Sequence, residues 1–502
     1  MKALSSILYL LSVIICLAQP QQAWVQRYNG GFTNKTNTPL AMKLDSAGSI
    51  YVAGSSQNAS NFYDYVVLKY APNGALQWSA RYSPTNGGTY PANGFALDQN
   101  GNTYLTGGIV DQNRYSHDKS YVIGNGGTVK INTNGTLAWA APYPGNDVAV
   151  DTNGNVYVTG FSTTEYATVK LDGNASNLWT RTYIGTGGPD NPVSVSQKVV
   201  TDNAGNVYVA GWADYFGFAY PGHTNLTYYS HPITFKYDGA GNCLWTNMYA
   251  GEGGIYWGDT KGLIADGQGN VYVTGNGDRT YETAKVNAGG QTLWGWQYGA
   301  APNVTTIAVD TNGNTYLAGG LYLTAKLWST NGQSAWLIYQ YSGYANAIEL
   351  DNSFNIYVTG FTNSEASGND WETVKYDNNG NQQWVIRYNG LANGNDGATA
   401  ITVAPDGSIY VTGYSANTNG GSDITTIKYG NLTNIQKEGE GSIQLQFFGT
   451  PGQSYNFQAT TDFLNWTNLG SSLADTNGLF EFLDTNAPLF PYRFYRWYYP
   501  SP

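Results

Sequence analysis

Short apolar runs separated by polar turns recur along most of the chain. One unit reads Asp151-Thr-Asn-Gly154-Asn-Val-Tyr157-Val-Thr-Gly160, where a polar turn leads into an apolar run that ends at glycine. Runs of this length, bounded by Gly, Asn and Asp, predict β-strands joined by tight turns. One apolar run precedes this stretch and two follow it, so each unit predicts a four-stranded antiparallel meander.

The unit recurs eight times, between 41 and 64 residues apart, centred on Tyr51, Tyr104, Tyr157, Tyr208, Tyr272, Tyr316, Tyr357 and Tyr410. A period near 50 residues with β-type composition is typical of propeller blades. We therefore expect an all-β, eight-bladed β-propeller. A seven-bladed ring is the alternative, in which the sixth, loop-poor copy is not a blade.

Each unit repeats the same side chains at the same places. A glycine lies three residues before the tyrosine, where a hairpin turn wants positive φ. Phe354 takes that place in the seventh unit, so we expect a turn of another type there. An aspartate six residues before the tyrosine can accept hydrogen bonds from the turn's amides. In the eighth unit Ala404 replaces it, and Asp406 is expected to serve the turn instead.

Every third strand carries a lysine, and every fourth strand begins with a tryptophan. A large ring can fill the wedge between neighbouring blades. Eight lysines at one structural position are expected to lay their apolar stems along a blade rather than to serve catalysis. The tryptophans are Trp24, Trp78, Trp139, Trp179, Trp245, Trp294, Trp336 and Trp384; the lysines are Lys69, Lys130, Lys170, Lys236, Lys285, Lys326, Lys375 and Lys428.

The two ends of the repeat region complement each other. It begins with a fourth strand, Trp24-Val-Gln-Arg-Tyr28, and ends with a third strand, Ile424-Thr-Thr-Ile-Lys428-Tyr429. We infer that the N-terminal strand completes the last blade, which closes the ring and removes its free edges.

The N-terminus has the features of a secretory signal: Lys2, an apolar run, then a small residue. We expect a signal peptide over residues 1–18, with cleavage possibly as late as 23, and a secreted or cell-surface protein. Cys16 lies inside it and would be the anchor of an alternative lipidated form. Cys243 is then alone in the mature chain, so no internal disulfide is expected.

These repeats resemble the bacterial SBBP β-propeller repeat family. The resemblance rests on Leu44-Asp45 … Gly54 and on Thr373-Val-Lys375-Tyr376-Asp377 … Gly380 … Trp384, and covers residues 23–430. The family is found mostly in exported proteins and has no uniform activity. It therefore implies a propeller fold and export but no catalytic residues.

Beyond residue 430 the period stops, and alternating apolar positions predict a compact β-sandwich over residues 431–502. The pattern Thr450-Pro-Gly452 … Thr461-Asp462 … Asn465-Trp466 … Arg493-Phe-Tyr495-Arg496 resembles small C-terminal β domains on secreted proteins of Verrucomicrobiota-like bacteria. The resemblance implies a role in surface attachment or secretion.

Charge excludes some partners. Only 11% of the residues are charged and the net charge is −11. A nucleic-acid partner needs a basic surface, and anionic membranes repel an acidic one, so we expect neither. No apolar stretch after the signal is long enough to span a membrane.

Candidate binding residues lie in the longest connections. In a meander the short Asp/Asn/Gly turns share one face of the ring, and the variable connections share the other, which we call the variable-loop face. Segments 212–233 and 250–261 on that face are rich in aromatic residues, which can stack on sugars. The predicted ligand-binding residues are Trp212, Tyr215, Tyr220, His223, Tyr228, His231, Tyr256 and Trp257.

The favoured interpretation is an exported, non-catalytic binding or scaffold propeller that recognises a polysaccharide or a surface protein. In an alternative interpretation the protein is purely structural, and these aromatic residues only cover one face of the ring. A polysaccharide hydrolase or lyase using Glu252 and Asp259 is another, although no catalytic motif appears. Asp151, Asn153 and Asn155 imitate part of a calcium loop that lacks its closing glutamate, so we expect no metal and no cofactor.

Overall fold

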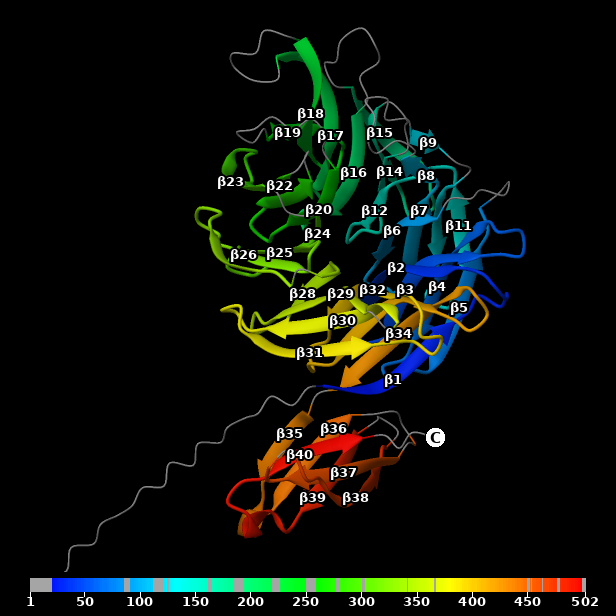
Figure 1. Ribbon diagram of the computed structural model, residues 1–502. Helices are drawn as coiled ribbons and strands as arrows, with labels where there is room; N and C mark the ends of the chain where they lie inside the picture. The colour runs from blue at the N-terminus through cyan, green and yellow to red at the C-terminus, as the bar shows by residue number, and fades with distance from the viewer. Residues whose placement is uncertain are drawn as a thin grey trace, which may run out of the picture. The chain divides into compact units, whose positions relative to one another are not determined.

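The computed structural model describes residues 20–502 outside 85–90, 112–120, 124–125, 161–164, 185–193, 219–225, 250–258, 277–279, 300–302, 341, 365–366, 431, 449–451, 453, 463, 476–478 and 499–502. Residues 22–429 form one compact unit, and residues 430–502 belong to another (Figure 1). The described residues contain no helix long and apolar enough to cross a membrane.

The larger unit consists of four-stranded antiparallel sheets, and the described residues form eight of them. The first strands are β2 (Asn37–Leu44), β6 (Ala92–Leu97), β12 (Asp147–Val150), β16 (Ser194–Thr201), β20 (Asp259–Ala265), β24 (Val304–Val309), β28 (Tyr344–Leu350) and β32 (Asp396–Val403). The second strands are β3 (Ile50–Gln57), β7 (Thr103–Gly107), β13 (Val156–Thr159), β17 (Val207–Phe218), β21 (Val271–Asn276), β25 (Thr315–Gly319), β29 (Ile356–Ser364) and β33 (Ile409–Ala416).

The third strands are β4 (Tyr63–Tyr70), β10 (Thr128–Ile131), β14 (Tyr166–Leu171), β18 (Leu226–Tyr237), β22 (Thr280–Val286), β26 (Leu323–Leu327), β30 (Gly368–Tyr376) and β34 (Ser422–Gly430). The fourth strands are β5 (Leu76–Tyr82), β11 (Leu137–Ala141), β15 (Asn177–Tyr183), β19 (Cys243–Met248), β23 (Thr292–Gly299), β27 (Ser334–Ile338), β31 (Gln382–Tyr388) and β1 (Gln21–Tyr28). A separate hairpin, β8 (Ile109–Asp111) and β9 (Tyr121–Ile123), interrupts the second sheet.

The sheets are blades of a propeller, which confirms the predicted all-β fold. We number them 1 to 8 by their first strands. Each first strand contacts the first strand of the next blade, and β32 contacts β2, so the first strands form the inner ring. In blade 8 the strand order is β1-β34-β33-β32, with the N-terminal strand in the fourth position.

A β-bulge in the first strand explains the glycine that lies three residues after the repeat tyrosine. In five blades the second strand continues beyond this glycine, which therefore does not end the strand as the apolar pattern suggests. The register shifts at this point in seven blades, and two residues there oppose one residue of the second strand. A Cβ on Gly211, Gly360 or Gly413 would lie within 2.2 Å of a carbonyl oxygen of the first strand. Only glycine allows the two backbones to approach so closely.

The bulges also link neighbouring blades. Asn146 in the connection before β12 donates through Nδ2 to the carbonyl of Ser196 in blade 4, at 3.0 Å. Asn346 donates in the same way to the carbonyl of Ala398 in blade 8, at 2.8 Å. These bonds cross from one inner strand to the next, so the inner ring is held by side chains as well as by packing.

A row of three side chains crosses every blade. In blade 3, Tyr157 pairs in register with Lys170, and Lys170 with Trp179. Across the eight blades the lysine Nζ lies 4.8 to 5.5 Å from the centre of the tyrosine ring. Each such contact stabilises by about 0.5–1 kcal/mol at exposed sites. The lysines are therefore part of the blade's structure.

The tryptophans join each blade to the next. Trp179 Nε1 donates to the carbonyl of Gly239 in the third turn of blade 4, at 3.3 Å. Equivalent bonds are made by Trp24, Trp78, Trp139, Trp245, Trp294 and Trp336. The ring thus fills the wedge between blades, as its size predicts, and its single polar atom is satisfied.

The turn at Phe354 corrects one expectation. Phe354 has φ 59° and donates to the carbonyl of Asp351, and Asp351 accepts from Ser353 and Asn355 through Oδ1. The glycine turns elsewhere have the same pattern, as at Asp151, so the turn is of the same type and the prediction of another type is wrong. Phenylalanine simply adopts the left-handed conformation there, at an energetic cost.

The smaller unit contains two three-stranded sheets, with strand orders β35-β36-β39 and β38-β37-β40. Phe447 and Phe480 from the first sheet pack against Phe457 and Tyr455 from the second, so the two sheets enclose one aromatic core. Its strands are β35 (Leu432–Lys437), β36 (Ile443–Phe448), β37 (Ser454–Thr460), β38 (Thr467–Leu473), β39 (Leu479–Asp484) and β40 (Phe494–Tyr498).

Candidate functional site

The hairpin of β17 and β18 carries most of the predicted binding residues. Each strand has 12 residues, and Figure 1 shows the pair running past its neighbours. In the backbone register Tyr215 pairs with Tyr229, Phe216 with Tyr228, and Ala213 with His231. The side chains of Tyr215, Tyr228 and His231, and the whole of Tyr220, His223, Tyr256 and Trp257, lie outside what the structure describes.

Trp212 is the one predicted binding residue whose side chain is described. It is 1% exposed, at the base of the hairpin opposite Pro232. A ring so deeply buried offers no face to a sugar at the surface. It instead forms part of the wall of a small cavity.

This cavity lies between blades 4 and 5, at the end of the strands that belongs to the variable-loop face. Its volume is about 20 Å³, enough for one water-sized group. Blade 4 contributes Trp212, Pro232 and Tyr249 to its wall. Blade 5 contributes Asp259, Asn276 and Glu282, among others. We call it the blade 4/5 cavity.

Glu282 is the most unusual group in the wall. Its side chain is only 4% exposed, and its Oε1 accepts a hydrogen bond of 3.3 Å from Gln297 Nε2. Its Oε2 has no partner among the described residues. Asn276 Oδ1 likewise has none, while Asn276 Nδ2 donates to the carbonyl of Val304 at 3.1 Å. Val304 belongs to blade 6, and Asn276 is one position along from the Gly275–Glu282 pair, so the Asn276 side chain points to the opposite face of the sheet. Glu282 Oε2 is therefore the unpartnered acceptor on the cavity side.

Burial raises the pKa of the Glu282 carboxyl to about 7. A carboxylate removed from water is disfavoured unless a cation or hydrogen-bond donors replace the lost hydration. Glu282 has one weak donor, so it stays protonated over a wider pH range than an ordinary glutamate does.

Blade 7 pairs a glutamate at the same position with a cation. Glu372 lies opposite Gly360 as Glu282 lies opposite Gly275. Its Oε2 accepts from Arg387 Nε at 2.8 Å, while its Oε1 has no partner among the described residues. Gln297 occupies the position of that arginine in blade 5. Blade 5 has thus kept the glutamate and lacks its cation.

Asp259, a candidate catalytic carboxylate, is already engaged. Gln197 Nε2 donates to its Oδ1 at 2.7 Å, and Lys261 forms an ion pair with its Oδ2. Its suggested partner, Glu252, lies outside the described residues.

Sequence reasoning missed Glu282, because a single glutamate in a third strand has no motif. Comparison of the eight units position by position contained the signal. Only units 5 and 7 have glutamate there, and only unit 7 pairs it with arginine.

A second group of charges lies on the inner strands. Lys43 of blade 1 interacts electrostatically with Asp147 of blade 3 and with Glu349 of blade 7. Because neither blade is a neighbour of blade 1, these side chains point towards the axis of the ring. Burial raises the pKa of Glu349 to about 7, against the charge of Lys43. Desolvation by the surrounding inner strands lowers the pKa of Lys43, although this residue keeps substantial exposure to solvent.

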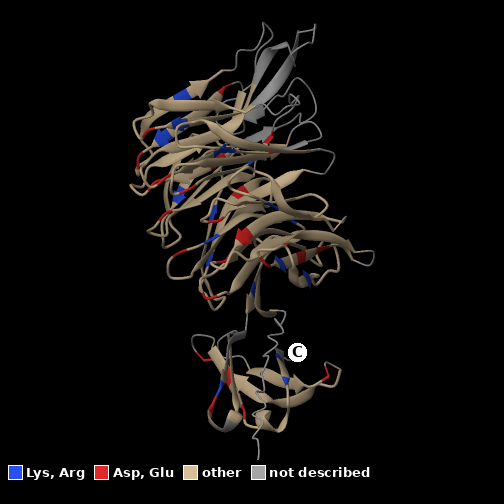
Figure 2. Cartoon of the chain, turned by 90° about the vertical axis from the view of Figure 1, so that its left-hand side faces the viewer, with Lys and Arg blue, Asp and Glu red and all other residues tan. Residues whose placement is uncertain are grey.

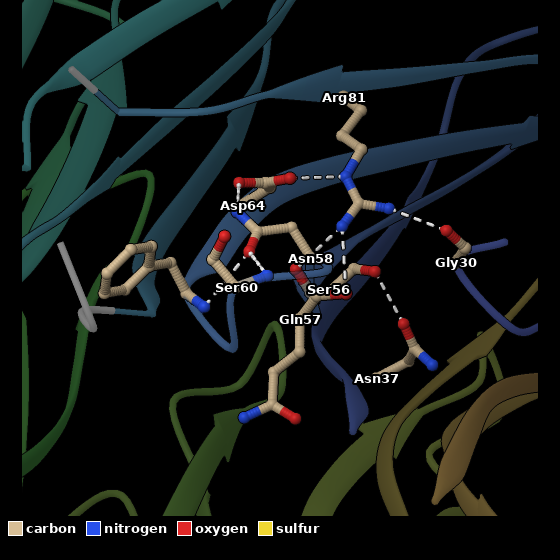
Figure 3. Close-up of polar contacts among 9 residues, drawn as sticks. Gly30, Asn37, Ser56, Gln57, Asn58, Ser60, Asp64 and Arg81 are labelled. Carbon is tan, nitrogen blue, oxygen red and sulfur yellow. Dashed lines mark hydrogen bonds and ion pairs between the residues drawn. The ribbon is translucent and has the colours of Figure 1, made fainter. Parts of the chain in front are cut away.

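Figure 3 shows a third polar cluster, around Arg81. Arg81 Nε donates to Asp64 at 2.5 Å, and its Nη atoms donate to the carbonyls of Gly30, Ser56 and Gln57. Every terminal nitrogen of Arg81 is occupied, so the cluster is structural rather than open to a ligand.

The same cluster continues to blade 8. Ser56 Oγ donates to Asn37 Oδ1 at 2.6 Å, and Asn37 Nδ2 donates to the carbonyl of Ser422 at 2.7 Å. It therefore ties blade 1 to blade 8 where the ring meets itself.

The aspartate turns use their carboxylates fully. Asp151 Oδ1 accepts from the amides of Asn153 and Asn155, and Oδ2 accepts from Asn155 Nδ2 and Tyr157 Oη. Four donors from the chain itself surround this carboxylate. In the described part of the chain, no three His, Cys, Asp or Glu residues gather as they would around a metal ion.

Charged residues are sparse in the structure. Figure 2 shows them as isolated blue and red segments among uncharged strands, on the side drawn there. The largest regular sets among these charges are the repeated aspartate turns and lysine rows described above.

Comparisons with known proteins agree with this fold. A family model described as "SBBP: Beta-propeller repeat" matches residues 144–165. A second, described as "Domain of unknown function (DUF5122) beta-propeller", matches residues 48–76. The protein is a β-propeller repeat protein. No curated protein matches the sequence.

Solved structures include similar propellers. The C-terminal WD40 domain of Sif2 has a TM-score of 0.52 and 11% identity, covering 79% of this chain and 99% of that one. BamB from Moraxella catarrhalis has a TM-score of 0.48 and 13% identity, covering 82% of this chain and 100% of that one. At these identities the likeness concerns the fold alone.

Proposed function

We propose that the protein is an exported, non-catalytic binding module that recognises a polysaccharide or a surface protein through its variable-loop face. The observation that carries this proposal is the blade 4/5 cavity, which lies at the base of the two segments with the predicted binding residues. Trp212 and Pro232 lie near the two ends of the first segment, Asp259 lies near the end of the second, and all three line the cavity. Partners commonly bind to connections held by a rigid scaffold.

Binding is favoured over catalysis by the size of the cavity. Sites for small molecules usually enclose about 300–1,000 Å³, whereas this cavity encloses about 20 Å³. A sugar ring does not fit in such a space beside Glu282 and Asp259. The alternative pair, Glu252 with Asp259, stays untested because Glu252 lies outside the described residues.

The test is binding of the full exported chain to an immobilised panel of plant, algal and bacterial polysaccharides. A Tyr256→Ala/Trp257→Ala variant removes two predicted binding rings. Tyr344→Ala is the matched control, because Tyr344 is an exposed aromatic residue in a different blade. We expect selective binding that the double variant loses and the control keeps.

Retention of selective binding by the double variant would contradict the assignment to segment 250–261. Absence of binding to every polysaccharide would leave the surface-protein partner, which is tested by crosslinking the exported chain on intact cells. Mass spectrometry of the same exported material should give a mature N-terminus between residues 18 and 24, as the proposed export requires.

A further inference from the structure

We infer that the blade 4/5 cavity is a binding site for one primary ammonium group, supplied by a lysine side chain of a protein partner. Glu282 is the counter-ion, and Trp212 completes the site. The inference goes beyond the proposed function because it specifies the chemistry that the variable-loop face recognises.

The cavity wall lacks donors where an ammonium group would supply them. Glu282 Oε2 is a buried acceptor without a partner among the described residues. Leaving a buried acceptor unsatisfied costs about 1–3 kcal/mol. An ammonium group carries three donors and a positive charge, so it can both satisfy this acceptor and neutralise the carboxylate. Trp212 adds an aromatic ring to the same wall, and such rings attract cations.

Size selects ammonium among the cations. The volume of about 20 Å³ accommodates one group of the size of a water molecule. An ammonium group has this size, whereas a planar guanidinium is too large. A single water would also fit, but it would leave the charge of an ionised Glu282 without a counter-ion. A lysine is suited to a buried carboxylate because its thin apolar stem can line the entrance while its charge lies inside.

The chain itself contains a precedent for a cation at this position. Arg387 neutralises Glu372 in blade 7, and Gln297 stands where blade 5 would need the equivalent arginine. The other titratable groups at the cavity are Tyr249 and Asp259, and Asp259 is already paired with Lys261. No cation among the described residues therefore neutralises Glu282 from within.

The titration of Glu282 agrees with this geometry. Burial places the pKa of Glu282 at about 7, so an entering cation displaces a proton near neutral pH. Binding should accordingly strengthen as pH rises from 6 to 8.5, and release about half a proton per site at pH 7.

The experiment measures binding of n-butylammonium, which mimics the end of a lysine side chain, to the full chain by isothermal titration calorimetry. Measurements at pH 7 in two buffers of different ionisation enthalpy give the protons released. Expected results are one site, affinity at least 10-fold tighter at pH 8.5 than at pH 6, and no heat from neutral 1-butanol or from tetramethylammonium.

Three variants make the result specific. Glu282→Gln removes the counter-ion, and Gln297→Arg supplies the cation that blade 7 has; both should lose binding. Gln297→Arg keeps Glu282 in place, so it remains informative if Glu282→Gln misfolds. Glu481→Gln lies in the smaller unit, changes the net charge as Glu282→Gln does, and should bind as the original chain does.

Peptides and sugars then identify the source of the ammonium. Immobilised lysine peptides should capture the chain, whereas acetyl-lysine and arginine peptides should not. Equal binding of n-butylammonium to the Glu282→Gln variant, or no binding at pH 8.5, would overturn the site. Capture by deacetylated chitosan oligomers but not by lysine peptides would overturn the assignment to a protein partner. Because these probes are not the polysaccharides of the panel, failure here is separate from failure of the proposed function.

Discussion

Replacement of Glu282 by glutamine should stabilise the propeller at alkaline pH. The substitution keeps the size of the side chain. Its amide cannot ionise. The cost of a buried carboxylate therefore disappears, while the bond to Gln297 can still form through the amide oxygen.

The magnitude follows from the pKa of Glu282, which burial raises from 4.5 to about 7. A difference of one pKa unit corresponds to about 1.4 kcal/mol, so the full difference is about 3 kcal/mol. Between pH 4.5 and 7 the folded chain holds the Glu282 proton and the unfolded chain loses it. The contribution of this group to stability therefore falls as pH rises through that interval, and stays low above it.

Urea unfolding of both proteins at pH 5.0 and pH 8.5 measures the effect. The gain in free energy of unfolding should be under about 1 kcal/mol at pH 5.0 and about 3 kcal/mol at pH 8.5. Glu372→Gln is the matched control in blade 7, where loss of the partner of Arg387 should destabilise at pH 8.5. A gain for Glu282→Gln that is equal at the two pH values would refute the reasoning, because no ionisation would then be involved.

Three other substitutions test the fold. Phe354→Gly should stabilise by about 1 kcal/mol in urea unfolding, since glycine adopts positive φ without the cost that phenylalanine incurs there; a loss of stability would contradict the strain. Gly360→Ala should cost about 1–3 kcal/mol by overpacking against the first strand, whereas Gly267→Ala, with no atom near its added Cβ, should change the melting temperature little; equal effects would refute the bulge argument. Lys43→Met should destabilise the protein more at pH 8.5 than at pH 5.5, because Glu349 is ionised at the higher pH and would lack its cation. Adding Glu349→Gln should restore stability at pH 8.5, and failure to do so would show that Lys43 does not act through Glu349.

The propeller could be predicted from the sequence because the residues that define each repeat act through interactions within their own unit. Turn glycines, turn aspartates and apolar strands each indicate a structure without reference to distant residues. The role of the glycine three residues after the tyrosine cannot be read from its own strand, since the bulge that demands it lies in a different strand. The prediction for the turn at Phe354 is wrong, because the preference against positive φ disfavours phenylalanine there without excluding it.

The candidate site was harder to predict. Aromatic residues of segments 212–233 and 250–261 marked a region, but Trp212 proved to be buried at its base rather than exposed. The unpaired carboxyl of Glu282 depends on a partner in the adjacent strand and on a wall from another blade. No sequence motif reveals the missing partner or the wall from another blade. Alignment of the eight units does show that blade 5 lacks the arginine that blade 7 has.

The position of β1 has a consequence for the order of folding. Blade 8 joins the first strand of the chain to one of the last in the repeat region, and Asn37 bonds Ser422 across 385 positions. Such distant pairings are slow to form, because the intervening chain must first be brought together. Blades 1 to 7 can form as their residues become available, but blade 8 has to wait for residue 430. Until then β1 is a strand without a sheet, and completion of the ring is the last event in the folding of the propeller.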